Sequence, residues 1–430
     1  MYFVVVCLTV TGAIGFCGWH SEARRNASST LELALFGVPR LVRFLHTADW
    51  QIGKPYARVR DPDNRARMRQ VRFESIRSMA ELVQNHRIDV VLIAGDLFDS
   101  PGPTSADVAQ SCSAIGALQV PVLVIPGNHD HGGPGSLWHQ RWFQGLADEL
   151  APNLEVLLRP EPLCRAGVTV LPCPLLRQAE SLDPTNWVRG LDPIELGDQP
   201  RILLAHGSVH GFGAADGDDE NPPPALNRLD LEALPQGLVD YVALGDWHGL
   251  KQVSSNAWYS GCPEQDRFPR GDDYRSGQVL LVELERGALP VVEVAKTGQL
   301  RWHHLCHRCN ADPDVKALKS LLQRQLASRS GEDLMLLELD GQLSLAANRL
   351  LTDLLESLEA RLLRLKLRNR LRIIADESET ADLTSRTSDP LVARVAAALQ
   401  ERSETDSDPE QVLLAQMALQ ELSNLCSVEL

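Results

Sequence analysis

The chain of 430 residues lacks three features that would assign it to a special class of protein. Its nine cysteines are scattered without a disulfide framework, which fits a reducing cytoplasm. It also has no excess of basic charge, because 42 Lys and Arg stand against 57 Asp and Glu, for a net charge of −15. That balance argues against a protein that holds nucleic acid unaided by broad electrostatics. It leaves open an enzyme whose positive charge is local, or is supplied by metals and a partner.

A clean membrane-spanning or secretory segment is also missing. Residues 2–19 are apolar, but Thr and Gly dilute the run and its length only just reaches a membrane span. No basic residue precedes it and no clear cleavage site follows it, so it is a poor signal peptide. We therefore interpret residues 1–40 as an extension from a mis-assigned start, in preference to a membrane anchor, and expect a cytoplasmic protein without a membrane partner.

One short segment has zinc-like spacing. Cys306 and Cys309 form a CxxC, and His303 and His304 come just before it. A single CxxC without a matching second pair is weak evidence for a structural zinc, so we interpret the segment as an ordinary linker.

Residues 41–300 have the pattern of an α/β domain. Short apolar, β-branched runs alternate with amphipathic stretches, and the segment 66–86 has apolar residues at helical spacing with its arginines on the other face. Four runs are expected to be buried strands, at 88–94, 120–125, 201–205 and 239–244.

The pattern changes after residue 300. Residues 311–375 predict a compact α+β unit, with helices at 312–328 and 344–361 and strands at 333–340 and 364–374. The last strand alternates strictly and places Lys366, Arg368, Arg370 and Arg372 on one face, either towards DNA or, as we favour, paired with Glu338 and Asp340. Residues 388–430 contain two helical segments, at 390–402 and 409–425.

Five motifs with metal-binding side chains follow the apolar runs of the first domain. They are Asp49-Trp50-Gln51, Gly95-Asp96-Leu97-Phe98-Asp99, Gly127-Asn128-His129-Asp130, His206-Gly207 and Gly245-Asp246-Trp247-His248-Gly249. In open α/β sheets functional groups gather beyond the carboxyl ends of strands, where all five motifs stand. Oxygen and imidazole ligands at this density suggest a two-metal phosphoesterase site.

The chemistry of phosphodiester hydrolysis suggests a role for each ligand. Asp96 is the natural bridge between two metals, because its carboxylate offers one oxygen to each. Asp49 would hold one metal, and Asn128 and His206 the other. His129 would contact phosphate or protonate the leaving group, and Asp130 would orient the His129 ring. Asp99 would support Asp96.

These motifs also carry a family resemblance. HTADWQIG, AGDLFDS, PGNHD, AHG and LGDWHG resemble the signatures of calcineurin-like metallophosphoesterases, and within them the SbcD-type bacterial DNA repair exonucleases, including the YhaO-like branch. The resemblance implies a two-sheet sandwich flanked by helices, followed by a small capping domain and C-terminal helices. It also implies two manganese ions, with magnesium as the alternative, and it places His248 at the first metal and His129 in catalysis.

Two positions depart from the family pattern. The first motif normally ends in His, where this chain has Gln51, and the last normally begins with His, where it has Asp246. Both substitutions put oxygen in place of imidazole, so they make the site harder and favour manganese or magnesium over zinc. We expect a site that is retained but retuned, and a degenerate site is the alternative.

Substrate and partner follow from the remaining charges and helices. A cluster of basic residues after the first motif, including Arg58, Arg60 and Arg65, would guide DNA or form a solvated helix face. By resemblance, the terminal helices would dock on the coiled-coil base of an SbcC-type ATPase. Assembly of two copies of this chain into a homodimer is a further possibility. We expect a DNA exonuclease or endonuclease in DNA repair. The alternatives are a non-catalytic or weakly active regulator of the ATPase, and a phosphoesterase of small nucleotides.

Overall fold

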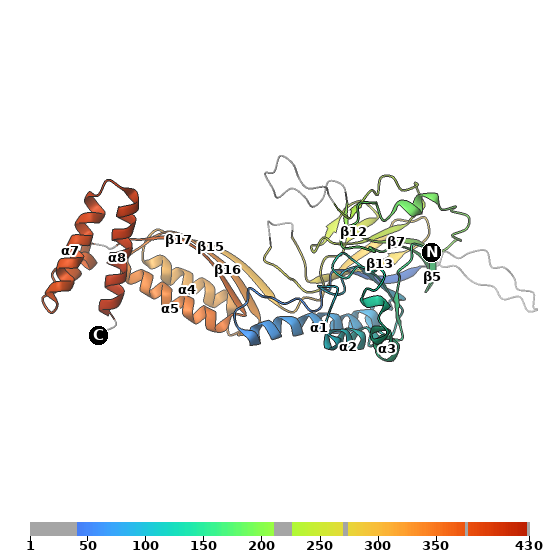
Figure 1. Cartoon of the computed structure of the whole chain (residues 1–430), viewed down its shortest axis with the longest axis horizontal. Coiled ribbons are helices and arrows are strands. Elements are labelled where there is room, and N and C mark those ends of the chain that lie inside the picture. Colours follow the sequence, from blue (N-terminus) through green and yellow to red (C-terminus); the bar gives the residue numbers. More distant parts are fainter. Residues whose placement is uncertain (1–40, 210–225, 270–273, 375–376, 428–430) are drawn as a thin grey trace, which may run out of the picture. The chain divides into compact units, whose positions relative to one another are not determined.

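A computed structural model describes residues 41–209, 226–269, 274–374 and 377–427 (Figure 1). The expected N-terminal extension, residues 1–40, lies outside the described residues. Across the described ranges, no helix combines the length and the apolar character that crossing a membrane requires.

The first of two large sheets carries three of the five motifs. Its six strands run in the order β14-β13-β1-β2-β3-β4. Strands β1 to β4 are parallel and β13 and β14 are antiparallel. Their bounds are β1 Val42–Thr47, β2 Val90–Ala94, β3 Val122–Ile125, β4 Leu154–Val156, β13 Gln278–Leu284 and β14 Val291–Lys296.

The second sheet carries the other two motifs, in the order β11-β12-β10-β7-β6-β5. Its bounds are β5 Leu163–Arg165, β6 Val168–Cys173, β7 Arg201–His206, β10 Tyr241–Gly245, β11 Lys251–Gln252 and β12 Ala257–Tyr259, beside a two-stranded pair, β8 Ser208–Val209 and β9 Arg228–Leu229. The two sheets share a core in which Phe44 and Leu92 of the first pack with Leu204 and Tyr241 of the second. This is the predicted two-sheet sandwich, which is confirmed.

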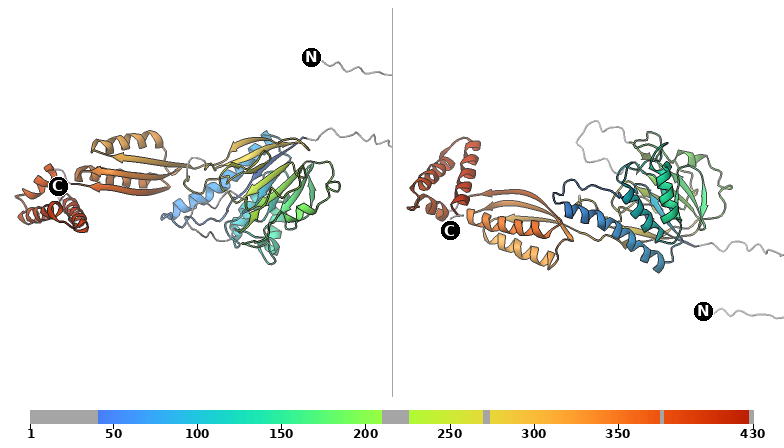
Figure 2. Two further views of the ribbon diagram at one scale, coloured as in Figure 1. Left: turned by 90° about the horizontal axis from the view of Figure 1, so that it is seen from above. Right: turned by 60° about the horizontal axis from the view of Figure 1, so that its bottom comes forward.

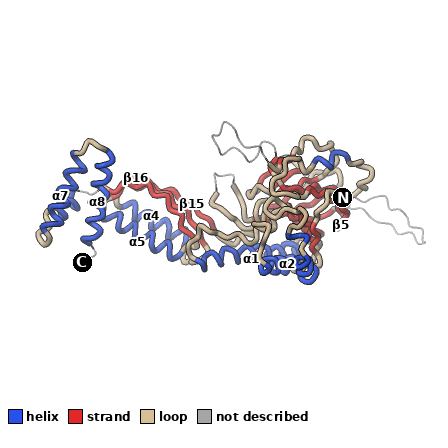
Figure 3. Tube along the Cα trace, in the orientation of Figure 1, coloured by secondary structure: helices blue, strands red, loops and turns tan. Residues whose placement is uncertain are grey.

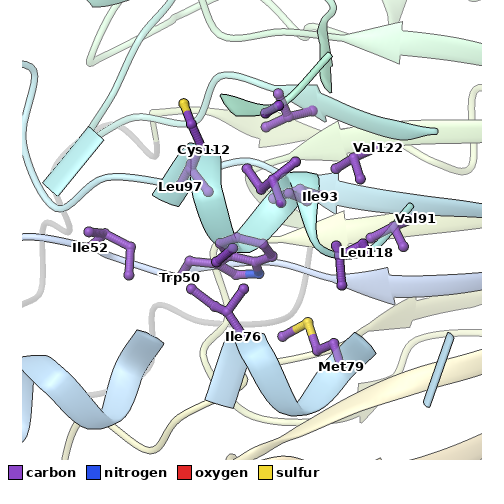
Figure 4. Close-up of a cluster of buried hydrophobic side chains, with 14 of the residues drawn as sticks. Trp50, Ile52, Ile76, Met79, Val91, Ile93, Leu97, Cys112, Leu118 and Val122 are labelled. Atoms are coloured by element: carbon purple, nitrogen blue, oxygen red, sulfur yellow. The ribbon is translucent and has the colours of Figure 1, made fainter. Parts of the chain in front are cut away.

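Helices cover the outer face of the first sheet. They are α1 Pro62–Asn85, α2 Ser105–Gly116 and α3 Arg141–Leu150, with a short 3₁₀ turn, η1 Leu137–His139, whereas a second turn, η2 Asn186–Gly190, packs on the second sheet. The side chain of Asp61 accepts from the backbone of Asp63 and Asn64 and so caps α1. Figure 4 shows how Ile76 and Met79 of α1 pack with Trp50, Val91 and Ile93. The loop after β1 is therefore anchored in the core on the helix side.

The prediction that α1 keeps its arginines on the solvent face is wrong at one position. Arg72 is buried, with 2% of its surface exposed. Its guanidinium donates to the carbonyl of Trp50 (2.6 Å) and to the hydroxyl of Tyr56 (2.7 Å). These bonds give partners to two of the three guanidinium nitrogens and hold the chain within the first motif, at Trp50, and just after it, at Tyr56.

The capping domain is a parallel three-stranded sheet, β15-β16-β17, with two helices on one face (Figures 2 and 3). The elements are β15 Arg301–Cys309, α4 Pro313–Leu326, β16 Asp333–Leu343, α5 Leu345–Arg361 and β17 Arg364–Ile373. The expected boundary at residue 311 omits β15, and the interpretation of residues 306–309 as a linker is wrong. Three further helices follow, α6 Glu377–Thr384, α7 Pro390–Thr405 and α8 Pro409–Ser427.

Candidate metal centre

The five motifs occupy turns at the carboxyl ends of β1, β2, β3, β7 and β10. Asp49 (φ 54°), Gln51 (φ 44°), Asp96 (φ 52°) and Asp246 (φ 99°) all have left-handed backbone, which costs free energy in residues other than glycine. Backbone bonds hold the first two turns together, from Asp49 N to the carbonyl of Gly95 (3.1 Å) and from Gln51 N to that of Asp96 (2.9 Å). The turns are thus fixed in conformations that direct the ligands inward.

Asp96 lies at the centre of the ligand group. One of its carboxylate oxygens is 3.6 Å from Nε2 of His206, and the other is 3.9 Å from Nε2 of His129. Ligand atoms of Asp49, Asp96 and His206, all buried, lie within 4.8 Å of one another. On the opposite side, Nε2 of His248 is 3.8 Å from the Asp49 carboxylate. A carboxylate between two groups of donors has the position of a bridge.

Hydrogen bonds set the tautomers of the three histidines. Nδ1 of His206 lies 2.7 Å from the carbonyl of Ala94, and Nδ1 of His129 lies 2.8 Å from that of Asp99. A carbonyl only accepts, so each Nδ1 donates and each Nε2 presents its lone pair to the centre. Nδ1 of His248 lies 2.9 Å from the carboxylate of Asp266, which accepts, and 2.7 Å from Nη2 of Arg267, which donates; we assign the Nδ1 proton to the bond with the carboxylate. Three imidazoles from three strand ends are therefore oriented for ligation or proton transfer.

The charge of the centre requires compensation. Burial raises the pKa of Asp49 to about 6, although His248 and His206 oppose the shift. Burial alone would lower the pKa of His206, but the carboxylates of Asp96, Asp49 and Asp246 outweigh it and raise that pKa to about 9. Buried carboxylates crowded in this way need either protons or cations.

Gln51 and Asp246 both lie at the centre, with different partners. The Gln51 carbonyl accepts from Nζ of Lys54 (2.5 Å), and its amide nitrogen lies 3.1 Å from Nε2 of His248. Gln51 would therefore join the ligand set only if its amide turned over. Asp246 accepts from the hydroxyl of Ser208 (2.7 Å) and lies 4.0 Å from Nε2 of His206, on the side of the second group of donors.

Asp130 and Asp99 have other contacts than those expected. The buried Asp130 carboxylate accepts from the backbone of Gly127 (2.7 Å) and of Phe98 (3.1 Å), so it ties the second turn to the third. Burial raises the pKa of Asp130 to about 7. The His129 ring is held instead by the carbonyl of Asp99. The Asp130 carboxylate thus ties the turns together, and the backbone carbonyl of Asp99 holds His129, whereas we expected Asp99 to support Asp96.

Sequence reasoning missed the group that supports His248. Asp266 follows no strand pattern, yet it is buried and accepts from His248, Lys54 (3.3 Å) and the hydroxyl of Tyr274 (3.1 Å). Burial would raise the pKa of Asp266, but the bond from His248 and the nearby cations hold it well below its usual range. An Asp within a loop gives no signal of such a role in a single sequence.

Comparison with known proteins agrees with this geometry. The calcineurin-like phosphoesterase family matches residues 42–270, which include all five motifs. The chain belongs to this family. It is therefore a phosphoesterase by family, a class of hydrolases that uses divalent metals.

Individual relatives are more distant. The chain is 25% identical over 284 residues to the SbcD component of the nuclease SbcCD of Escherichia coli strain K12, covering 59% of this chain and 67% of that protein. The corresponding component of the Staphylococcus epidermidis nuclease is 21% identical over 258 residues, 56% of this chain and 66% of that protein. The DNA double-strand break repair protein Mre11 of Methanosarcina acetivorans is 28% identical over 274 residues, 59% of this chain and 39% of that protein. The chain thus spans about two thirds or less of the length of these relatives.

The donors fit the divalent metals of a calcineurin-like phosphoesterase. The buried group offers carboxylate and amide oxygens and imidazole nitrogens, which suit manganese and magnesium better than a thiolate set would. Two glycines let the donors come this close. A Cβ on Gly127 would lie 2.1 Å from the Asp96 carboxylate, and one on Gly95 would lie 2.2 Å from Nδ1 of His206.

A basic groove adjoins the centre. Its lining includes aromatic Tyr56, Phe268 and Trp302 together with Lys54, Arg58, Arg267, Arg364, Lys366 and Arg368. Arg60 and Arg65, the other two arginines expected to contact DNA, differ in their exposure and contacts. Arg60 is exposed, whereas Nη1 of Arg65 donates to the carbonyl of Val59 (3.0 Å) and so holds the loop.

Proposed function

We propose that this chain is a metal-dependent DNA phosphodiesterase, an exonuclease or endonuclease of DNA repair that acts with an SbcC-type ATPase. The observation that carries the proposal is the set of three histidines whose Nε2 atoms converge on the buried carboxylates of Asp49 and Asp96. The names of the relatives support the nuclease activity and its place in DNA repair.

The proposed site divides its residues between two metals. Asp49 and His248 serve the first, Asp96 bridges, and Asn128 and His206, whose Oδ1 and Nε2 are 2.9 Å apart, serve the second, with Asp246 beside it. Bound divalent ions supply a nucleophile at neutral pH and neutralise charge on the phosphoryl group. Mostly oxygen donors favour manganese here, with magnesium as the alternative.

His129 is the proposed catalytic residue. Its side chain is 41% exposed, whereas that of Asp96 is 2% exposed, so His129 stands at the rim where a phosphodiester would arrive. The carbonyl of Asp99 fixes its Nδ1, which leaves Nε2 to contact phosphate or, when protonated, to give a proton to the leaving oxygen. Asp130 assists only through the turns that it holds.

The groove is the proposed path of the DNA. Its cations neutralise phosphates and its aromatic rings stack with bases, so the acidic whole chain keeps a local basic surface. Arg58→Glu with Arg60→Glu should weaken DNA binding and flatten its salt dependence, while Arg159→Glu, at a site 80% exposed, should change neither. Equal effects of the two changes would remove the groove from the proposal.

The domain division and the partner surface remain proposals as well. We place the metallophosphoesterase domain at 41–300, the capping domain from residue 301 and the partner-binding helices at 388–430. Leu399, Leu419 and Leu422 of the last helices pack inward, whereas Leu413, Leu414 and Met417 are more than half exposed. Apolar side chains on one amphipathic helix suit a groove on another protein, here the ATPase.

Cleavage assays separate the alternatives. The full chain would be tested with manganese on labelled duplex and single-stranded DNA and on a small aryl phosphodiester. We expect DNA cleavage that is lost in Asp96→Ala, falls by about 10²- to 10⁴-fold in His129→Ala, and persists in His86→Ala, a surface control. Cleavage of the small diester alone favours the small-nucleotide enzyme. Inactivity with and without the ATPase favours the regulatory role.

A further inference from the structure

The exposed face of the capping sheet carries a second cluster of metal-binding side chains. On a strand, residues two apart share a face and residues three apart do not. Cys306 is therefore exposed while Cys309 is buried, so the CxxC of this chain does not form a chelate. His304 shares the exposed face with Cys306, and Glu338 is the register partner of Cys306 on β16.

The three donors of this cluster lie close together. Nε2 of His304 is 3.6 Å from Sγ of Cys306 and 2.8 Å from the Glu338 carboxylate, and all three ligand atoms lie within 4.8 Å of one another. Bond lengths to zinc place the donors of a tetrahedral ion roughly 3.3–3.6 Å apart. The nitrogen and sulfur already have that separation, and the carboxylate needs to move by only about half an ångström.

We propose that His304, Cys306 and Glu338 form a zinc site on the capping domain, separate from the catalytic centre. Imidazole, thiolate and carboxylate are the usual ligands of zinc, and a three-ligand set leaves a fourth position for water or another molecule. The exposed thiol of Cys306 is the ligand that sets this site apart, because the thiol near the catalytic centre, that of Cys262 beside His248, is buried.

Arg368 links the site to the rest of the exposed face. Its Nη1 donates at 3.0 Å to the Glu338 oxygen that also faces Nε2 of His304, so zinc and Arg368 compete for this carboxylate. Zinc binding releases the guanidinium, which also lines the basic groove. This step rests on the proposed function: the released Arg368 guanidinium can bind a DNA phosphate in the groove, so zinc binding strengthens DNA binding.

Cobalt spectroscopy of the full chain tests the site. A thiolate bound to Co²⁺ gives a charge-transfer band that carboxylates and imidazoles do not give. We expect this band in the native protein, its bleaching by zinc, and its loss in Cys306→Ser and His304→Ala. Cys164→Ser, at another exposed cysteine, and Cys262→Ser, next to His248, should keep it. Absence of the band in the native protein, or its persistence in Cys306→Ser, would overturn the proposal.

Substitution of Arg368 should strengthen metal binding, whereas substitution of a ligand should abolish it. Arg368→Ala removes the competitor of the metal, so cobalt affinity should rise about two- to five-fold, the range of an exposed ion pair. Arg308→Ala, on the same face, is the matched control, and an equal change in both would refute the competition. Zinc should tighten DNA binding in the native protein but not in Cys306→Ser. If the native protein gives the cobalt band but zinc does not tighten its DNA binding, the metal site stands and only the activation of DNA binding is rejected.

Discussion

At the scale of single residues, the sequence predicted which side chains come together better than it predicted the contacts that hold them. Asp96, His206 and His248 could be placed because each follows a buried strand, and strand ends meet in space. The bonds from Asp266 to His248 and from Lys54 to Gln51 could not be predicted, since they join loops whose paths no local pattern encodes. The contacts of Asp130 with Gly127 and Phe98 could not be predicted for the same reason, because adjacency in sequence to His129 does not fix the direction of a side chain.

Gly127 gives the first prediction at this scale. A methyl group at this position would lie 2.1 Å from the Asp96 carboxylate and 2.6 Å from its backbone nitrogen, so Gly127→Ala must displace the bridging residue. Manganese affinity, measured by calorimetric titration, should fall about 10- to 100-fold. Gly102→Ala, where a Cβ meets nothing within 4 Å, should bind manganese normally. Unchanged binding in Gly127→Ala would mean that Asp96 does not bridge.

Gln51 gives the second prediction at this scale. Gln51→His puts an imidazole beside His248 and Asp49 in place of an amide whose carbonyl is held by Lys54. We expect tighter metal binding and a shift of preference from manganese towards zinc, because imidazole favours the later transition metals. Separate titrations with manganese and zinc measure the two affinities, and Gln51→Ala serves as the control without a donor. An unchanged ratio of the affinities would argue that Gln51 lies outside the ligand set.

At the scale of helices and strands, apolar periodicity located the buried strands β2, β3, β7 and β10 and most of helix α1, but it left β6 and β13 unplaced although both are almost wholly buried. It failed at β15, because only Leu305 and Cys309 of that strand contribute to the core of the capping domain. The other face carries Trp302, His304, Cys306 and Arg308, which together read as a polar linker. A strand at the edge of a sheet with one covered face needs few apolar residues, so the pattern of its sequence is weak.

Helix α1 gives a prediction on stability. Arg72→Met removes two bonds to the chain around the first motif and leaves the carbonyl of Trp50 without its donor. We expect a loss of about 2–4 kcal/mol in unfolding free energy, seen as a lower urea midpoint by circular dichroism. Manganese binding should weaken as well, because Trp50 lies between Asp49 and Gln51. Arg69→Met, exposed on the same helix, should change neither, and equal losses in both variants would contradict this reading.

At the scale of the whole molecule, net charge was a poor guide to the local charge beside the metal centre. The chain carries −15 overall, yet six of its basic side chains line one groove beside the metal centre. An average over the chain cannot report such a concentration, since the six basic side chains of the groove are accompanied by two acidic ones, Asp99 and Asp266. It does bear on assembly: a protein with this charge gains from sharing its hold on DNA with a partner.

Helix α8 provides the test of that assembly. Leu414→Glu with Met417→Glu places charge on side chains that are 54% and 59% exposed, so the fold should tolerate the change. Burying these carboxylates against the coiled-coil base of an SbcC-type ATPase would be costly, and affinity should fall by more than about 30-fold in a fluorescence titration. Metal binding and cleavage of a small diester should stay normal. Leu289→Glu, at a position 71% exposed in the metallophosphoesterase domain, should bind the ATPase like the native chain. If both variants bind equally well, the terminal helices are not the docking surface.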